Sequence, residues 1–289
     1  MIIIKPILKW AGGKRQLLNT INQLKPQNFN RYVEPFCGGA AVYFNLCPHN
    51  AIIGDKNRDL INCYKQIRDN LPYVKRELNL HTKYHDEKYY YEMRDKFNAR
   101  RRNSKLNLNS VDAALMIYLN KAGYNGMFRE NLKGDFNIPS GKKKSVTLYE
   151  NGNLEKCSEQ LTHTQILCAD FEDIARQAQM NDFVFFDSPY DDTFHTYQAG
   201  GFTKNDHERL ANLFYDLTNR GVYCMLTNNA TDYIKSLYTD QRYSYEEVGV
   251  RRMISSNSSR PIETEIIITN YPITVSYTHL RAHETGAYL

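Results

Sequence analysis

Short apolar runs and helical patterns alternate along the chain. Strand-like segments occur at residues 32–35, 51–54, 164–169, 183–186, 222–227 and 265–270. Between these runs, apolar residues recur at helical spacing, which predicts helices over residues 40–46, 173–178 and 203–220. Thr203, followed three positions later by Asp206, is a variant of the capping box and favours a helix start there. Alternating strands and helices indicate an α/β sheet.

Residues 56–145 depart from this alternation. They contain several amphipathic helical stretches and little that alternates as a strand. The clearest stretch places on one face the apolar residues Val111, Ala114, Leu115, Tyr118, Leu119 and Ala122. No internal repeat or long low-complexity linker separates this part from the rest. We therefore predict a helical lobe, residues 56–145, inserted into a sheet domain of residues 1–55 and 146–274 and packed against it.

The apolar run 183–186 ends in Asp187-Ser188-Pro189-Tyr190. These residue types suit methylation of an amino group on a nucleobase, because that nitrogen is a poor nucleophile whose lone pair is delocalised into the ring. Asp187 and the Ser188 carbonyl would each accept one N–H hydrogen bond and aim the lone pair at a methyl group. Pro189 would stiffen the turn, and Tyr190 would stack on a base rotated out of the duplex. Taken alone, the tetrapeptide also fits an ordinary turn after a strand.

A second motif lies at a predicted turn from strand to helix. The run 32–35 leads into Phe36-Cys37-Gly38-Gly39, where paired glycines let a ligand approach the backbone and the helix N-terminus favours a carboxylate. Asp55 closes the next strand, where an acidic side chain usually binds ribose hydroxyls. A dinucleotide site is a weaker alternative, because G-x-G-x-x-G is absent. Residues 9–14, K-W-A-G-G-K, add an aromatic ring and two cations around a pair of glycines.

Together these motifs resemble those of the Dam-type DNA adenine-N6 methyltransferases of the D12 class, in which K-W-A-G-G-K, F-x-G-G and D-P-P-Y occur in this order. The resemblance continues through residues 118–129, 136–139, 251–252 and 268–271, and it covers nearly all of residues 5–272. It implies an α/β fold with a Rossmann-like, S-adenosylmethionine-dependent methyltransferase sheet and an inserted helical DNA-recognition lobe. Double-stranded DNA is the implied partner.

The resemblance also implies which residues bind the cofactor and the flipped adenine. Contacts with S-adenosylmethionine are expected, from the family pattern and from the glycine loop, for Trp10, Lys14, Phe36, Gly38, Gly39, Asp55, Asp170, Phe171 and Asp187. The adenine would bind at residues 187–190. One position departs from the family, since most members have proline where this chain has Ser188. Because the atom needed there is a main-chain oxygen, we expect reduced or normal activity and no loss of it.

The helical lobe carries the predicted reader of the DNA sequence. Tyr124, at the tip of a turn-prone segment, could insert its ring between base pairs, and Arg129 lies within reach of a guanine edge. In relatives that recognise GATC, the target is contacted by the positions matching Lys9, Tyr124, Met127, Arg129 and Pro139, so GATC is the predicted target. Further predicted DNA contacts are Asn125, Lys142, Arg251 and Arg252. For the basic cluster 100–102 two roles are possible from the sequence: it binds phosphates, or it forms a solvated surface.

Two other functions stay open from the sequence. A cytosine-N4 methyltransferase would use the same kind of tetrapeptide, although the recognition lobe favours adenine. A catalytically silent DNA-binding regulator is the second alternative, and the complete set of cofactor residues argues against it. The methyl transfer needs no metal, because the donor already carries positive charge. His81 and His85, four residues apart, are therefore predicted to lie on a solvent-facing helix and not in a metal site.

The composition agrees with a soluble DNA-binding protein without proving one. The formal net charge of the 289 residues is +5, which suits a polyanionic partner. Six cysteines, among them Cys168 and Cys224 in apolar runs, form no C-x-x-C pair and predict buried, reduced thiols in a cytoplasmic protein. No apolar run is long enough for a signal peptide or a membrane span. We expect a monomer or weak dimer, and a non-native tail at residues 275–289, which resembles translated adapter sequence.

Overall fold

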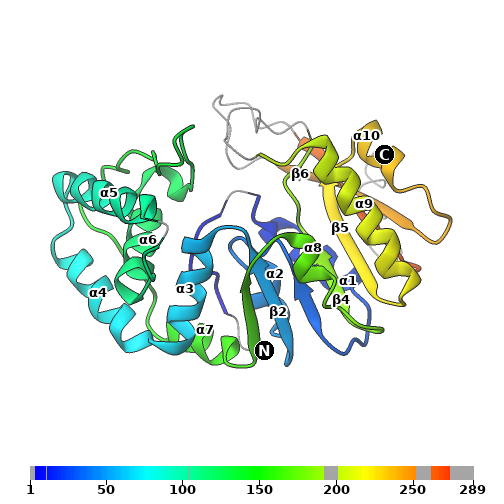
Figure 1. The fold of residues 1–289 in the computed structure, drawn as a ribbon, viewed down its shortest axis with the longest axis horizontal. Coiled ribbons are helices and arrows are strands. Elements are labelled where there is room, and N and C mark those ends of the chain that lie inside the picture. The colour runs from blue at the N-terminus through cyan, green and yellow to red at the C-terminus, as the bar shows by residue number, and fades with distance from the viewer. Residues whose placement is uncertain (1–3, 11, 104, 192–200, 252–261, 274–289) are drawn as a thin grey trace, which may run out of the picture.

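Seven strands form one sheet in the order β3-β2-β1-β4-β5-β7-β6 (Figure 1). The structure is a computed structural model that describes residues 4–10, 12–103, 105–191, 201–251 and 262–273. The strands are β1 (Tyr32–Glu34), β2 (Ala51–Asp55), β3 (Thr164–Cys168), β4 (Phe183–Phe186), β5 (Tyr223–Asn229), β6 (Ser244–Arg251) and β7 (Ile262–Thr269). β1 to β5 pair in parallel, whereas β7 runs antiparallel between β5 and β6. The predicted α/β fold is confirmed.

All six predicted strands are present, with bounds that differ by one to three residues at some ends. Within the described ranges, sequence reasoning missed β6. This strand lies at the edge of the sheet, carries Glu246 and Glu247, and exposes Tyr245. Because an edge strand is only partly covered, it does not need the continuous apolar run by which a buried strand is recognised.

Helices cover both faces of the sheet (Figure 1). Tyr32, Ile53 and Phe185 point to one face, where they pack with α1 (Leu18–Leu24), α2 (Ala41–Leu46), α3 (Arg58–Asp69) and α7 (Asn153–Leu161). Val33 and Ile52 point to the other, which is covered by α8 (Phe171–Ala175), α9 (Lys204–Asn219) and α10 (Asp232–Leu237). α9 starts at the predicted position, because Thr203 and Asp206 form a capping box. Burial on both faces explains why β4 is a continuous apolar run and why β2 begins with one, whereas β1 ends in the buried Glu34.

The helical lobe lies beside the sheet and consists of α4 (Leu71–Lys83), α5 (Glu87–Arg102) and α6 (Ser110–Ala122) (Figure 1). α6 packs against α3, α4 and α5, and it is buried almost all round, including Met116 and Ile117. The single apolar face predicted for this helix therefore understates its burial. Apolar side chains of the lobe and of the sheet belong to one continuous core. The domain boundaries themselves stay a prediction.

Two predictions about single side chains are wrong. His81, expected to face solvent, is buried in the lobe and stacks on Tyr118 with ring centroids 4.8 Å apart. Its Nδ1 lies 2.8 Å from the Tyr89 hydroxyl, and burial lowers the pKa of His81 to about 4. Cys168, expected to be buried, is exposed because it ends the edge strand β3. Tyrosine rings of the lobe thus provide a packed environment for His81 that its sequence neighbours do not reveal.

Three further features concern membrane spans, metal sites and cysteines. Within the described ranges, no helix combines the length and apolar character of a membrane span. In the same ranges, no three His, Cys, Asp or Glu side chains gather where they could hold a metal ion. All six cysteines are free thiols. The predicted non-native tail, residues 275–289, lies outside the described residues.

Candidate active site

Asp187 lies just beyond the C-terminal end of the central strand β4, which has β1 and β5 as neighbours. Its side chain is 19% exposed, and its Oδ1 is 2.6 Å from Lys14 Nζ. The Thr227 hydroxyl of β5 donates to the same oxygen at 3.2 Å. Burial raises the pKa of Asp187, and the Lys14 ammonium opposes that rise. Because ligands of open α/β sheets bind beyond the carboxyl ends of the strands, Asp187 is placed where substrate chemistry is expected.

Lys14 connects two of the predicted catalytic side chains. It belongs to the short helix η1 (Lys14–Gln16), and its side chain is only 4% exposed. Besides Asp187, its Nζ contacts the Gly12 carbonyl oxygen at 2.6 Å and lies 4.6 Å from the ring centroid of Tyr190. A single buried cation thus binds a carboxylate, a carbonyl and an aromatic face. This arrangement fixes Asp187 and Tyr190 relative to each other.

Polar side chains of β5 and β7 hold the turn that follows Asp187. Asn228, which is fully buried, donates from Nδ2 to Ser188 Oγ at 3.3 Å and accepts from the Asp191 N–H at 3.0 Å. The Tyr190 hydroxyl donates to Glu265 Oε2 at 2.6 Å. Sequence reasoning missed these supporting residues. The run Thr-Asn-Asn at positions 227–229, at the end of an apolar strand, is a signal that could have identified two of them.

The loop between β1 and α2 lies against Trp10. Gly38 has a φ of +43°, and a Cβ there would lie 2.7 Å from Trp10 Cδ1, so both its backbone and its packing require glycine. The Gly38 N–H donates to Asp55 Oδ2 at 3.1 Å, and the Asn57 N–H donates to Oδ1 at 2.9 Å. Burial raises the pKa of Asp55. The segment around Trp10, the glycine loop and the end of β2 therefore meet at the same edge of the sheet.

Phe36, Asp170 and Phe171 form a second group of predicted cofactor residues. The rings of Phe36 and Phe171 are stacked with centroids 5.1 Å apart. The Asp170 carboxylate forms ion pairs with Lys56 at 2.7 Å and with Arg209 at 2.8 Å. The two rings thus provide an aromatic surface, whereas Asp170 already has two cationic partners. A direct contact of Asp170 with a cofactor stays a prediction.

Glu34, at the end of β1, is a buried carboxyl group that sequence reasoning did not single out. It is 2% exposed, and its Oε2 accepts hydrogen bonds from the Tyr32 hydroxyl at 3.0 Å and from the Tyr43 N–H at 3.2 Å. Burial raises the pKa of Glu34 to about 8, and the nearby Asp187 carboxylate adds to the rise. Glu34 is therefore mostly protonated at neutral pH, directly beside the charged pair Lys14 and Asp187.

Glu34→Gln should stabilise the protein more at pH 8 than at pH 5. Folding raises the pKa of Glu34, so its contribution to stability is complete below the ordinary glutamate pKa and is lost as pH rises towards about 8. Glutamine stays neutral and keeps an acceptor oxygen for Tyr32 and Tyr43. Thermal unfolding of both proteins across this range measures the effect. A difference in Tm that does not change with pH would show that Glu34 titrates normally.

Residues 123–140 form a hairpin, called the recognition hairpin here after the DNA contacts predicted in it, with antiparallel bridges between Gly123 and Ser140 and between Glu130 and Phe136. The short helix η2 (Tyr124–Gly126) directly follows the Gly123–Ser140 bridge, and Tyr124 is 52% exposed there. Other predicted DNA contacts exposed on or beside it are Lys9, Asn125, Arg129, Pro139 and Lys142, whereas Met127 is half-buried. The side chain of Arg251, and Arg252 altogether, lie outside the described residues.

Each arginine of the basic cluster 100–102 forms an ion pair. Arg100 pairs with Asp112, Arg101 with Asp59 and Glu130, and Arg102 with Asp135. These ion pairs join α5 to α3, to α6 and to the recognition hairpin. Arg102 is exposed to solvent, as one of the two alternatives expected, whereas Arg100 and Arg101 are partly buried by their partners. Phosphate binding stays a prediction.

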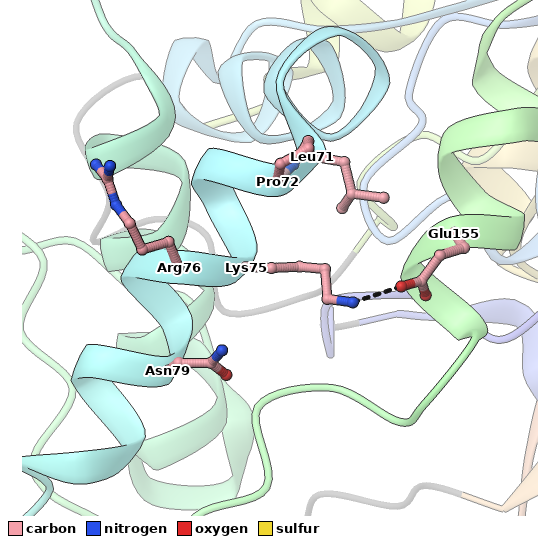
Figure 2. A pocket seen from close by; sticks show the side chains of 6 residues that line it. All are labelled: Leu71, Pro72, Lys75, Arg76, Asn79 and Glu155. Carbon is pink, nitrogen blue, oxygen red and sulfur yellow. Dashed lines mark hydrogen bonds and ion pairs between the residues drawn. The ribbon is translucent and has the colours of Figure 1, made fainter.

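A shallow pocket between α4 and α7 is separate from these residues (Figure 2). It is lined by Leu71, Pro72, Lys75, Arg76, Asn79 and Glu155, and the Lys75 ammonium pairs with Glu155 at 2.6 Å. None of the predicted site residues lines this pocket. The candidate active site is therefore defined by the strand ends and their polar side chains.

Residues 10–254 match the family model described as D12 class N6 adenine-specific DNA methyltransferase. The match spans most of the chain and includes the site around Asp187. This chain belongs to the D12 class of N6 adenine-specific DNA methyltransferases. The resemblance inferred from the order of the motifs is thereby confirmed, and the D12 methyltransferase is an enzyme that acts on adenine in DNA.

Named relatives support the same assignment. The type II methyltransferase M1.LlaDCHI of Lactococcus lactis subsp. cremoris is 37% identical to this D12 methyltransferase, over 93% of the chain and 96% of that protein. The DNA adenine methylase of Escherichia coli strain K12 is 30% identical, over 92% of the chain and 95% of that protein. The DNA adenine methylase of Haemophilus influenzae is 28% identical, over 91% and 92%. Among solved structures, a precorrin 8w decarboxylase from Methanobacterium thermoautotrophicum has a TM-score of 0.37 and 9% identity, too low to inform the function.

Proposed function

We propose that this D12 methyltransferase uses S-adenosylmethionine to methylate N6 of an adenine rotated out of double-stranded DNA. The observation that carries the proposal is the cluster of Asp187, Lys14 and Tyr190 beyond the carboxyl end of β4. Aromatic and carboxylate groups beside this cluster suit the cofactor, because Phe36 and Phe171 offer ring faces and Asp55 can accept from ribose hydroxyls. No metal is part of the proposal.

The cofactor residues we assign are Trp10, Lys14, Phe36, Gly38, Gly39, Asp55, Asp170, Phe171 and Asp187. When bound, S-adenosylmethionine supplies an electrophilic methyl group on a positively charged sulfur. Closely packed Gly38 and Trp10 shape the wall of the site. The protein contributes position and charge, and the driving force for transfer belongs to the cofactor.

Asp187 and the Ser188 carbonyl hold the two hydrogens of N6 and direct the nitrogen lone pair towards the methyl group. Lys14 and Thr227 both contact Asp187 Oδ1, so we assign Oδ2 as the acceptor for N6. The ring of Tyr190, fixed through its hydroxyl by Glu265, stacks on the base. The N6–carbon bond would form as the sulfur–methyl bond breaks, with S-adenosylhomocysteine as the leaving group. The N6 proton would be lost after transfer, because the N–H becomes acidic only once the nitrogen carries positive charge, and Asp187 Oδ2, which holds that hydrogen, would accept it. Asp187 therefore acts mainly by alignment and by stabilising charge.

Ser188→Pro, which restores the residue found in most of the family, should change the methylation rate by less than about tenfold. The essential atom is the main-chain oxygen, which both residues supply, while the Ser188 hydroxyl only accepts from Asn228. Initial rates at saturating cofactor measure the effect. A wild type without measurable activity that Ser188→Pro restores would show that the turn requires a second proline ring.

We propose GATC as the target. Lys9, Tyr124, Met127, Arg129 and Pro139 retain side chains suited to the contacts that the resemblance implies, and most of them, like the further predicted contact Asn125, are exposed on the recognition hairpin or beside it. Lys142, Arg251 and Arg252 are proposed phosphate contacts. Arginine can bind guanine O6 and N7 together, which contributes about 1–3 kcal/mol of discrimination. A cytoplasmic location and a monomeric or weakly dimeric state stay predictions.

The test is to incubate plasmid DNA with the protein and S-adenosylmethionine labelled on the methyl group. Digestion with enzymes that require adenine methylation at GATC, or are blocked by it, then identifies the site. We expect label in N6-methyladenine at GATC. Label in N6-methyladenine elsewhere would change the proposed target, and label in cytosine would favour the N4-methylating alternative. No transfer at all would support the silent regulator.

A further inference from the structure

Asn120 joins the segment of Lys9 and Trp10 to the recognition hairpin. It lies in α6, is 1% exposed, and uses its amide in both directions. The Lys9 N–H donates to its Oδ1 at 2.9 Å, and its Nδ2 donates to the Lys9 carbonyl at 2.9 Å and to the Gly126 carbonyl at 3.0 Å. One buried side chain therefore fixes the backbone before Trp10 and the backbone of η2 in the recognition hairpin.

Trp10 and Phe128 make a second connection between the same two parts. Their rings are stacked with centroids 5.1 Å apart and planes 20° from parallel. The indole also lies against the glycine loop, since a Cβ at Gly38 would be 2.7 Å from Trp10 Cδ1. Trp10 is thus held between the glycine loop on one side and a ring of the recognition hairpin on the other.

A close contact between Gly126 and the Lys9 side chain reinforces this connection. A Cβ at Gly126 would collide with Lys9 Cδ, so η2 and Lys9 are in direct contact. Gly126 has a φ of +68°, which glycine adopts without strain. The distance between η2 and Lys9 therefore cannot change without breaking the hydrogen bonds of Asn120. These contacts connect the proposed DNA reader with the proposed cofactor wall.

We propose that Asn120 and Phe128 are positioning residues that couple recognition of the DNA target to cofactor binding through Lys9 and Trp10. This inference rests on the proposed function, which assigns Trp10 to the cofactor and the hairpin to DNA. A duplex that orders the hairpin also fixes Trp10, and a cofactor seated against Trp10 in turn fixes the hairpin. By linkage, each ligand raises the affinity for the other by the same factor.

The experiment measures that factor with S-adenosylhomocysteine, which cannot donate a methyl group. Its Kd is determined by equilibrium dialysis for the full chain alone, with a duplex that contains the mapped methylation site, and with a duplex in which that site is scrambled. For the wild type we expect the target duplex to tighten binding at least about fivefold, as is typical of allosteric coupling. The scrambled duplex should have a smaller effect.

Three variants distinguish coupling between the DNA and cofactor sites from general stabilisation of the recognition hairpin. Asn120→Leu removes the bonds to Lys9 and Gly126, and Phe128→Leu removes the stack on Trp10. In both variants, the ratio of the Kd without DNA to the Kd with the target duplex should fall close to one. Asn98→Ala is the matched control, because Asn98 is also buried and also bonds the hairpin backbone twice, at Phe136, without reaching Lys9. It should retain the ratio of the wild type.

The inference would be overturned if the target duplex did not change the Kd of the wild type. It would also be overturned if Asn120→Leu and Phe128→Leu both kept the wild-type ratio of Kd values, or if Asn98→Ala lowered that ratio as much as they do. If Asn120→Leu does not fold, the half-buried Phe128 still provides the test. Trp10 is the single tryptophan of the chain, so its emission on addition of target duplex gives a second readout. Failure of the wild type to bind S-adenosylhomocysteine or to methylate DNA would instead refute the proposed function.

Discussion

Asp187→Ala should lower kcat about 10³-fold, or roughly 4 kcal/mol of transition-state stabilisation. The substitution removes the carboxylate proposed to hold one N6 hydrogen and leaves only the Ser188 carbonyl to orient the amine. Cofactor binding should weaken but remain measurable, because Asp187 is one of several assigned contacts. Single-turnover methylation of target DNA at saturating cofactor measures the chemical step, and equilibrium dialysis measures binding.

Asp191→Ala is a matched control for this substitution. Asp191 belongs to the same turn and its carboxylate accepts from the Thr231 hydroxyl at 2.8 Å. Its main-chain bonds to Asn228 and Asn229 do not depend on the side chain. We expect a rate within about tenfold of the wild type. Equal rates for wild type and Asp187→Ala would remove Asp187 from the mechanism.

Lys14→Met should destabilise the folded protein by about 3–5 kcal/mol, because it leaves the Asp187 carboxylate buried without its cation. The double variant Lys14→Met with Asp187→Asn should recover part of that loss, since it removes both charges. Denaturant unfolding of the wild type, the two single variants and the double variant gives the coupling free energy of the pair. A coupling free energy near zero would mean that the pair does not contribute to folding.

The single substitution Lys14→Met should also change the pH dependence of activity. Lys14 opposes the rise in the Asp187 pKa that burial causes, so removing Lys14 should raise this pKa further. A larger fraction of Asp187 is then protonated at a given pH, and the acidic limb of kcat/KM should move to higher pH. This shift separates an electrostatic role of Lys14 from a purely structural one, which would lower activity equally at every pH.

The sheet was predictable from the sequence because its central strands are buried on both faces. Most positions of β2 and all positions of β4 are apolar, and such runs are easily recognised in a sequence, while β1 was recognised from Tyr32 and Val33 before the glycine loop. β6 is partly exposed at the edge of the sheet, and its glutamates interrupt the apolar run by which a strand is recognised. The burial of His81 was unpredictable for a related reason, since the rings that enclose it come from other helices and leave no signal in its own helix.

The motifs named the candidate site residues, and the structure brings Asp187, Lys14 and Tyr190 together, whereas the side chains that support them were missed. The roles of these residues stay predictions. The order of three motifs located Asp187, Trp10 and Lys14, because each motif has a local pattern of glycine, proline, charge and aromatic residues. The ion pair between Lys14 and Asp187, and the bonds from Asn228 and Glu265, join residues far apart in the chain. Single side chains of this kind carry no local pattern, and only the three-dimensional structure identifies them.

The position of Glu265 on β7 has a consequence for the order in which a nascent polypeptide gains activity. A ribosome produces Tyr190 long before Glu265, which follows 75 residues later. Until β7 is synthesised and inserts between β5 and β6, the tyrosine ring lacks this carboxylate anchor and β5 lacks its antiparallel neighbour. A fragment released by premature termination before β7 would therefore contain Asp187, Lys14 and Tyr190, yet it would lack the Glu265 contact that holds Tyr190 in the proposed adenine site.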